Sequence, residues 1–139
     1  MNEVFEGKGI IIHELRHLSP QEALNCSKQG AIFIDVREEF MSHVKTFDVD
    51  DIRIFSLRKF KQQFHLLPTD QPLIFADATG VKSKSAAEYA QSQGLTQIAN
   101  LAGGLLQWER DGMPTLTYQT IKVNGRNRCE FIHKDDLGK

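Results

Sequence analysis

The chain has 139 residues, of which 40% are hydrophobic and 25% are charged, and its formal net charge at pH 7 is -1. These values are typical of one globular domain with a real core, and the near-neutral charge argues against a surface built for nucleic acid or an anionic membrane. No apolar run approaches the roughly 20 residues that cross a bilayer, and the N-terminus shows no secretion signal. The two cysteines, Cys26 and Cys129, are too few for a disulfide scaffold. We therefore expect a cytoplasmic protein.

The N-terminal part of the chain predicts a strand followed by a capped helix. Residues 1–9 are expected to be a frayed lead-in, and residues 10–15 are expected to form a short strand. Ser19 and Glu22 form the S-x-x-E pattern of a capping box, so a helix is expected to begin there. Gly30 is expected to end this helix, because glycine is the usual residue just beyond a helix C-terminus.

The next part of the chain alternates between apolar and polar segments. The run 31–36 (AIFIDV) is typical of a strand buried on both faces, and residues 52–55 predict another strand after a charged stretch. A helical stripe is expected next, because four apolar residues recur at helical spacing before Pro68. These residues are Leu57, Phe60, Phe64 and Leu67.

The segment that follows predicts two more strand-helix units. Residues 72–76 (PLIFA) predict a buried strand, and the helix after it carries small residues on one face, so it can lie close to a sheet. These small residues are Ser83, Ala86, Ala87 and Ala90. Residues 97–104 predict a strand that leads to a Gly-Gly turn, and residues 105–112 predict a short helix. The alternation of strands and helices predicts an α/β sandwich with a mostly parallel sheet.

The C-terminal tail has a different pattern. Residues 115–133 alternate around Asn124-Gly125, the strongest short signal for a β-hairpin, and a two-residue turn would place Tyr118 opposite Phe131. A free hairpin is only marginally stable in water. We therefore expect one face of this hairpin to be buried against its own domain or against a second copy, which would give a homodimer. That face carries Leu116, Tyr118, Cys129 and Phe131.

The loop after the PLIFA strand is a candidate anion-binding site. A strand-loop-helix unit presents backbone N–H groups and the positive end of a helix dipole at the carboxyl end of a strand, where open α/β sheets bind ligands. Gly80 lets the loop turn tightly, Lys82 adds a cation, and Ser83 or Thr79 can cap the helix. The alternative is a capped helix behind a polar loop. The candidate loop residues are Asp77, Ala78, Thr79, Gly80, Val81, Lys82 and Ser83.

Four segments, taken in order, resemble the signatures of the rhodanese-like domain. They are IDVRE at 34–38, EFMSHV at 39–44, FADATGVKSKSAA at 75–87 and IANLAGGLLQWERDGMP at 98–114. The resemblance covers about residues 10–116 and implies a three-layer sandwich, with a five-stranded, mainly parallel sheet and helices on both faces. We therefore expect a rhodanese-like domain at 1–116 and a hairpin and tail extension at 117–139. The resemblance also implies that Asp35 and Arg37 form an ion pair that organises the strand end near the loop.

In active members of that family the loop follows the pattern C-x-x-G-x-[RK]-S, and its cysteine carries sulfur as a persulfide taken from thiosulfate or a similar donor. Aligning Gly80, Lys82 and Ser83 to this pattern places Asp77 where the cysteine stands. A carboxylate cannot form the persulfide, because the reaction needs a soft thiolate nucleophile. Asp77 has two open interpretations. It fills the loop as a resident anion, bound by loop N–H groups and paired with Lys82, or it points into solvent and caps the helix.

The resemblance and Asp77 together predict a catalytically inactive rhodanese-like domain that acts as a binding or regulatory module in sulfur-related metabolism. A protein partner is expected, and no nucleic acid, membrane, metal or cofactor. One alternative is a sulfurtransferase that uses Cys26 or Cys129. The other is a phosphohydrolase with Asp77 as nucleophile, which needs a second aspartate two residues later, where Thr79 stands.

Overall fold

The computed structural model of the protein describes residues 4–123 and 126–133, with side chains as far as residue 118. Its main sheet has six strands in the order β1-β2-β7-β6-β3-β5, and all of them are parallel except β1, which lies antiparallel to β2 at one edge. In chain order these strands are β1 (Ile10–Ile12), β2 (Leu15–Leu18), β3 (Ile32–Asp35), β5 (Ile52–Ile54), β6 (Leu73–Ala76) and β7 (Ile98–Leu101). The α/β fold class is confirmed, but the sheet has one strand more than the expected five.

The additional strand comes from the segment 10–15, which does not form a single strand. His13 and Glu14 have positive φ angles of 49° and 70°, so the chain reverses between β1 and β2 in a tight hairpin turn. Positive φ is uncommon outside glycine, and neither residue is a typical turn former. The sequence therefore carries no clear signal for this reversal.

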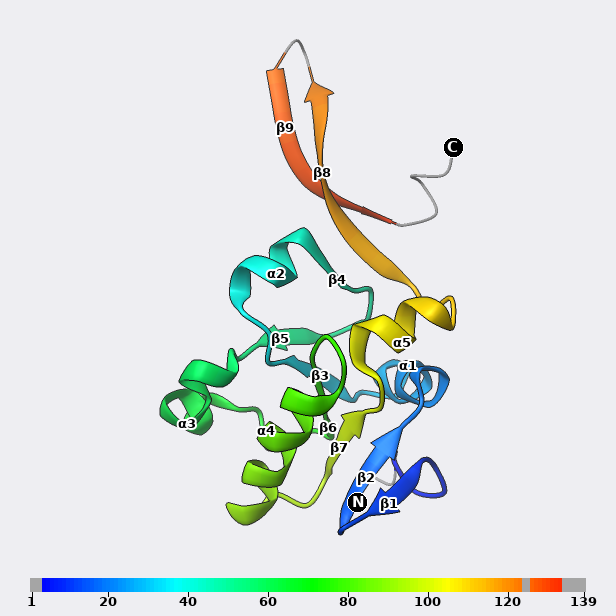
Figure 1. Ribbon diagram of the computed structural model, residues 1–139, viewed down its shortest axis with the longest axis vertical. Coiled ribbons are helices and arrows are strands. Elements are labelled where there is room, and N and C mark those ends of the chain that lie inside the picture. Colours follow the sequence, from blue (N-terminus) through cyan, green and yellow to red (C-terminus); the bar gives the residue numbers. More distant parts are fainter. Residues whose placement is uncertain (1–3, 124–125, 134–139) are drawn as a thin grey trace.

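Helices cover both faces of the main sheet (Figure 1). The elements α1 and α5 pack on one face, and α4 packs on the other face together with the three short elements between β5 and β6. The helical elements are α1 (Pro20–Lys28), α2 (Glu39–Val44), the 3-10 turn η1 (Leu57–Lys59), α3 (Phe60–Gln63), the 3-10 turn η2 (Phe64–Leu66), α4 (Val81–Ser92) and α5 (Gly104–Arg110). The capping box is confirmed: Ser19 Oγ accepts a hydrogen bond from Glu22 N, and the Glu22 carboxylate accepts one from Ser19 N.

Each face of the sheet has its own core. On the α1 and α5 face, the rings of Phe33, Phe47 and Trp108 contact one another with centroids 5.3 to 5.5 Å apart. Trp108 meets both phenyl rings edge to face, an arrangement that adds to the stabilisation from buried area. On the other face, the predicted small-residue stripe of α4 is confirmed. Its four members, Ser83, Ala86, Ala87 and Ala90, are all buried.

The prediction that the first residues form a frayed lead-in is wrong for Val4 and Phe5. Val4 and Phe5 are only 6% and 8% exposed, and they pack into the same core as Trp108. A contact between the chain start and the last helix is long-range, so local sequence patterns do not predict it.

A second, three-stranded sheet joins the C-terminal hairpin to the body through strand β4 (Lys45–Phe47), which pairs with β8 (Thr115–Val123). Strand β8 then pairs antiparallel with β9 (Arg126–His133), with Tyr118 opposite Phe131, so the predicted hairpin pairing is confirmed. The turn residues Asn124 and Gly125 lie outside the described residues.

The hairpin extends away from the helical layers (Figure 1). Tyr118 is 43% exposed, so the prediction that its face is buried against its own domain is wrong for this residue. The side chains of Cys129 and Phe131 lie outside the described part, and burial against a second copy stays a prediction. Across the described residues, no helix has both the length and the apolar character to span a membrane.

Candidate functional site

The candidate loop connects β6 to α4 at the carboxyl end of the parallel strands. Gly80 ends it with a φ angle of 91°, and a Cβ at this position would lie 2.9 Å from the Gly103 nitrogen. Both the left-handed backbone and the close approach require glycine. The loop is therefore held tightly against the turn between β7 and α5.

The Asp77 carboxylate is enclosed by this loop. Its side chain accepts hydrogen bonds from the backbone N–H groups of Gly80 and Lys82, the latter at 3.0 Å, and Ser83 Oγ lies 3.2 Å from Oδ1. Asp77 is only 3% exposed. The interpretation in which it points into solvent is therefore wrong. The hydrogen bonds from loop N–H groups that the resident-anion interpretation expects are present.

Two details of the loop differ from expectation. Neither Thr79 nor Ser83 caps α4. The N-cap residue is Gly80, which has no side chain to accept a capping hydrogen bond. The Asp77 carboxylate binds the free amides of the first turn instead. Lys82 contributes its backbone N–H, while its side chain is exposed and forms no ion pair with Asp77 in the described structure.

The loop carbonyls are bound by the start of α5. Leu105 N donates to the Asp77 carbonyl at 2.9 Å, and Leu106 N donates to the Ala78 carbonyl at 3.0 Å. A Cβ at Gly104 would lie 2.6 Å from backbone atoms of this loop. Sequence reasoning did not foresee this contact, although the Gly-Gly pair before the last helix is a signal for close backbone approach.

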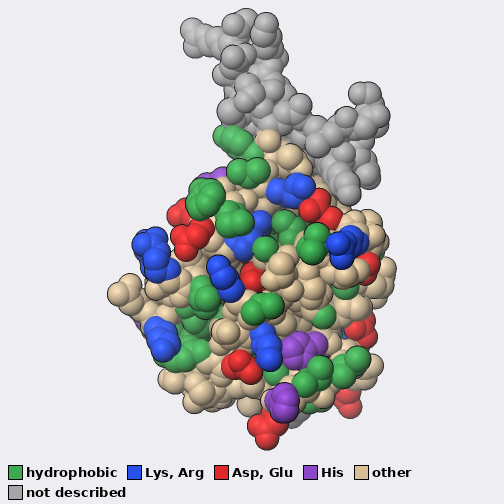
Figure 2. All heavy atoms as spheres, in the orientation of Figure 1, with side chains coloured by type: hydrophobic (Ala, Val, Ile, Leu, Met, Phe, Trp, Pro, Cys, Tyr) green, Lys and Arg blue, Asp and Glu red, His purple; other side chains and the backbone are tan. Residues whose placement is uncertain are grey.

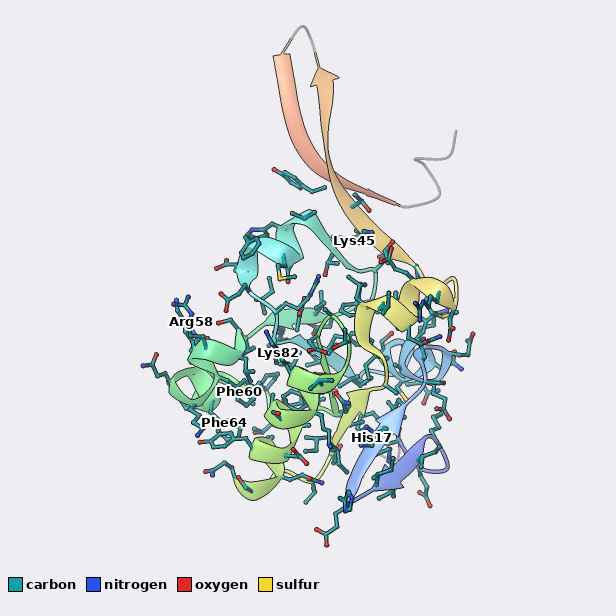
Figure 3. All side chains as sticks on the ribbon, in the orientation of Figure 1. His17, Lys45, Arg58, Phe60, Phe64 and Lys82 are labelled. Atoms are coloured by element: carbon teal, nitrogen blue, oxygen red, sulfur yellow. The ribbon has the colours of Figure 1, made fainter. Side chains whose placement is uncertain are left out.

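A buried polar network continues from the loop into the sheet. Asn100 on β7 donates through Nδ2 to the Gly80 carbonyl at 3.1 Å, and its Oδ1 lies 2.6 Å from Ser83 Oγ. His17 Nδ1 on β2 lies 3.3 Å from Asn100 Nδ2 (Figure 3). Sequence reasoning missed both Asn100 and His17, since they belong to strands that reach the loop only through the sheet order.

His17 is held in an environment that favours its neutral form. Its Nε2 atom is buried and has no hydrogen-bond partner among the described residues. Desolvation and the positive charge of Lys84 lower the pKa of His17, while Glu88 opposes them. The neutral ring is also the form that can accept a hydrogen bond from Asn100 through Nδ1.

A cavity of about 470 Å³ opens in front of the loop. Its lining combines apolar side chains with basic and acidic ones. The lining residues are Val36, Arg37, Glu38, Met41, Leu57, Arg58, Asp77, Ala78, Thr79, Val81 and Lys82. Arg58 of η1 and Lys82 of α4 belong to this lining, and Arg58 lies 3.7 Å from Glu38. Figure 2 shows basic and hydrophobic side chains interspersed on the face presented in this view. Such a cavity suits a partly apolar ligand.

The predicted ion pair between Asp35 and Arg37 is confirmed. Arg37 Nη2 lies 2.9 Å from Asp35 Oδ2, and both side chains are buried. Ser42 Oγ donates to the same carboxylate at 2.6 Å, and Arg37 also donates to the Lys45 carbonyl at 2.9 Å. The pair therefore fastens α2 and β4 to the carboxyl end of β3, beside the loop.

Cys26 does not belong to this site. Its side chain is fully buried in α1 and donates to the Val4 carbonyl at 3.6 Å. Burial raises the pKa of the Cys26 thiol, so the thiolate that a nucleophile needs is disfavoured. The side chain of Cys129 lies outside the described residues.

Proteins of known sequence and structure resemble this chain over most of its length. Residues 19–111 match the Rhodanese family, described as the rhodanese-like domain. "Thiosulfate sulfurtransferase GlpE" from Ectopseudomonas mendocina is 32% identical over 110 residues, covering 76% of this chain and 94% of that protein. A protein of the same name from Haemophilus influenzae is 29% identical over 103 residues, covering 71% and 92%.

Solved structures give the same picture of the fold. A rhodanese-related protein from Thermoplasma volcanium has a TM-score of 0.64 at 23% identity and covers 72% of this chain and 96% of its own. A rhodanese homologue from Thermus thermophilus has a TM-score of 0.55 at 26% identity, with coverages of 66% and 99%.

Proposed function

Because the chain belongs to the rhodanese-like domain family, we propose that it is a member whose loop carries its own anion and that it acts as a binding or regulatory module. The relatives named thiosulfate sulfurtransferase indicate a family chemistry of sulfur transfer. Aligning Gly80, Lys82 and Ser83 with the family's loop pattern puts Asp77 at the position of the sulfur-carrying cysteine. This alignment supports a protein that does not carry sulfur on its loop.

One observation carries the proposal: the Asp77 carboxylate lies inside the loop, accepts hydrogen bonds from the Gly80 and Lys82 amides and lies beside Ser83 Oγ. Two unit charges about 4 Å apart repel by roughly 4 kcal/mol at an effective dielectric constant of about 20. That repulsion corresponds to nearly three powers of ten in affinity. Sulfate or thiosulfate is therefore expected to bind this loop weakly.

The same observation bears on the alternative activities. A phosphohydrolase would need the Asp77 oxygens free to attack phosphorus, and here both oxygens accept hydrogen bonds from the loop. Sulfur transfer through Cys26 is disfavoured by its burial. A sulfurtransferase that works through Cys129 is the alternative left for experiment.

The partner is proposed to be a protein that covers the cavity in front of the loop. Met41, Leu57 and Val81 line this cavity, and Val81 is 68% exposed. Phe40, next to Met41 on α2, is also 68% exposed. Exposed apolar side chains gathered around a cavity are typical of an interaction surface. The proposed setting is a cytoplasmic, sulfur-related process without a cofactor.

The test is a labelling experiment with thiosulfate. The natural protein is incubated with thiosulfate and its intact mass is measured, and thiocyanate production is followed after adding cyanide. We expect neither a persulfide nor thiocyanate. A second variant, Asp77→Cys in a Cys129→Ser background, tests whether a cysteine thiol at position 77 restores persulfide formation on the loop.

The decisive control is the Cys129→Ser variant of the natural protein. Persulfide formation that is abolished by Cys129→Ser would contradict the proposal and establish the sulfurtransferase alternative. Thiocyanate production by the natural protein that survives this substitution would also contradict it.

A further inference from the structure

Strand β1 is an unusual edge for the main sheet. Its three residues are consecutive isoleucines, Ile10, Ile11 and Ile12, and their side chains are 68%, 60% and 48% exposed. It pairs with β2 on one side only, and no described strand pairs with its other side. Exposed apolar edge strands are templates for pairing with another strand.

The hairpin register shows which backbone groups are open. The two-residue turn of His13 and Glu14 makes Ile12 and Leu15 a hydrogen-bonded pair. Hydrogen-bonded pairs alternate along an antiparallel ladder, so the N–H and C=O of Ile11 point away from β2. The next outward amide, Gly9 N, is already taken by the Glu22 carboxylate at 2.8 Å. Ile11 is therefore the centre of the open edge.

The opposite edge of the same sheet is protected. Strand β5 has Arg53 as its middle residue, 47% exposed on its side chain and paired with Asp51 at 3.1 Å. A charge in the centre of an edge strand is a common device against edge-to-edge pairing. Strand β1 has no such charge, so the two edges of one sheet differ in the feature that decides pairing.

We propose that β1 pairs antiparallel with β1 of a second copy of this chain, about a twofold axis at Ile11, so that the two main sheets become continuous. Ile11 and the partner's Ile11 exchange their two outward hydrogen bonds in this register. Ile10 lies beside the partner's Ile12, and Ile12 lies beside the partner's Ile10. The patch is thus self-complementary, as a twofold interface requires.

Side-chain direction and charge agree with this register. Ile12 is opposite Leu15, whose side chain packs in the α4 core. Alternation along the strand therefore puts Ile10 and Ile12 on the α4 face of the sheet and Ile11 on the other face. Antiparallel pairing about Ile11 also brings Lys8 to the same end of the ladder as the partner's Glu14. Opposite charges meet at both ends, which favours a second copy over an unrelated strand.

The interface centres on three isoleucines from each copy. Stable dimers bury about 1,200 Å² or more in total, which a strand of this length does not supply by itself. We therefore expect a reversible dimer whose population rises with protein concentration.

The test uses the full chain in sedimentation velocity and light scattering over a range of concentrations. We expect the natural protein to shift from monomer to dimer, and Ile11→Lys to raise the dissociation constant about tenfold or more, because it places two like charges opposite each other at the axis. Ile54→Lys on the protected edge is the matched control, since Ile54 is also an exposed isoleucine at 38%. We expect this control to associate like the natural protein.

A second measurement keeps the proposal testable if Ile11→Lys folds poorly. In a Cys129→Ser background, Ile11→Cys is expected to form a disulfide between copies under mild oxidation, because Cα atoms of such a pair lie about 5.5 Å apart. Ile54→Cys is expected to remain monomeric on the same gel. A protein that stays monomeric at all concentrations would overturn the proposal. So would a dimer that survives Ile11→Lys but is lost in Tyr118→Lys, which would assign the interface to the C-terminal hairpin.

Discussion

Replacing Asp77 with alanine tests whether the carboxylate holds the loop together. The change leaves the N–H groups of Gly80 and Lys82 without their acceptor, while Ser83 keeps Asn100 as a partner. Hydrogen bonds to a charged group contribute about 1.5–3 kcal/mol each. The loop borders the cavity, so water can reach the two amides and replace part of this loss. We expect the free energy of unfolding to fall by about 2–3 kcal/mol.

The same variant should gain an anion site. In urea unfolding, sulfate is expected to stabilise Asp77→Ala by roughly 1.4 kcal/mol when its concentration reaches about ten times the dissociation constant. The natural protein is expected to respond only as it does to sodium chloride at matched ionic strength. Asp77→Asn is the control of similar shape, and it should lose less stability because an acceptor oxygen remains. Equal stability of Asp77→Ala and the natural protein, or equal sulfate affinity, would refute the idea that Asp77 fills the loop.

Three further predictions use matched pairs or a pH series. Asp35→Ala should lower the free energy of unfolding in urea by about 3–5 kcal/mol, because it leaves a buried arginine without its ion-pair partner. Asp51→Ala removes an exposed ion pair and should lower the free energy of unfolding by about 1 kcal/mol or less. Similar losses in the two variants would refute the idea that burial sets the cost of breaking the pair. Gly104→Ala should lower the melting temperature far more than Gly112→Ala, because both have positive φ but only the first would bring a Cβ within 2.6 Å of the loop backbone; equal melting temperatures would contradict this contact. The lowered pKa of His17 means that, at pH values between this lowered pKa and about 6.5, the unfolded chain binds a proton that the folded chain does not. Stability should therefore fall as the pH decreases from about 7.5 to about 5.5, and less so in His17→Gln; equal slopes for both proteins would rule out His17 as the cause.

Features that depend on neighbouring residues were predictable from the sequence. The capping box at Ser19 and Glu22 needs only four consecutive residues, and the small-residue face of α4 follows from helical spacing. The hairpin pairing of Tyr118 with Phe131 follows from a two-residue turn and strict alternation. In each case the determining interactions lie within one element or between adjacent ones.

Features that depend on the sheet order were not predictable from the sequence. The network from the loop to His17 exists because β2 lies beside β7, although these strands are far apart in the chain. The burial of Val4 and Phe5 likewise depends on a core completed by the last helix. The loop was located from its motif, but the direction of the Asp77 carboxylate depends on the amides that α4 presents.

The position of β2 in the sheet has a consequence for biosynthesis. Arg16 on β2 is paired with Ala99 on β7, so roughly 80 residues must be synthesised before β2 can find its parallel neighbour. At about 5–20 residues per second, this takes on the order of 4–16 seconds. During that time the nascent chain presents an isoleucine-rich hairpin without the sheet that supports it. Contacts of such long sequence separation form slowly, and among the described strands no other parallel pairing of the main sheet joins strands so far apart in the chain, so this hairpin is the last part of the sheet to gain its neighbour.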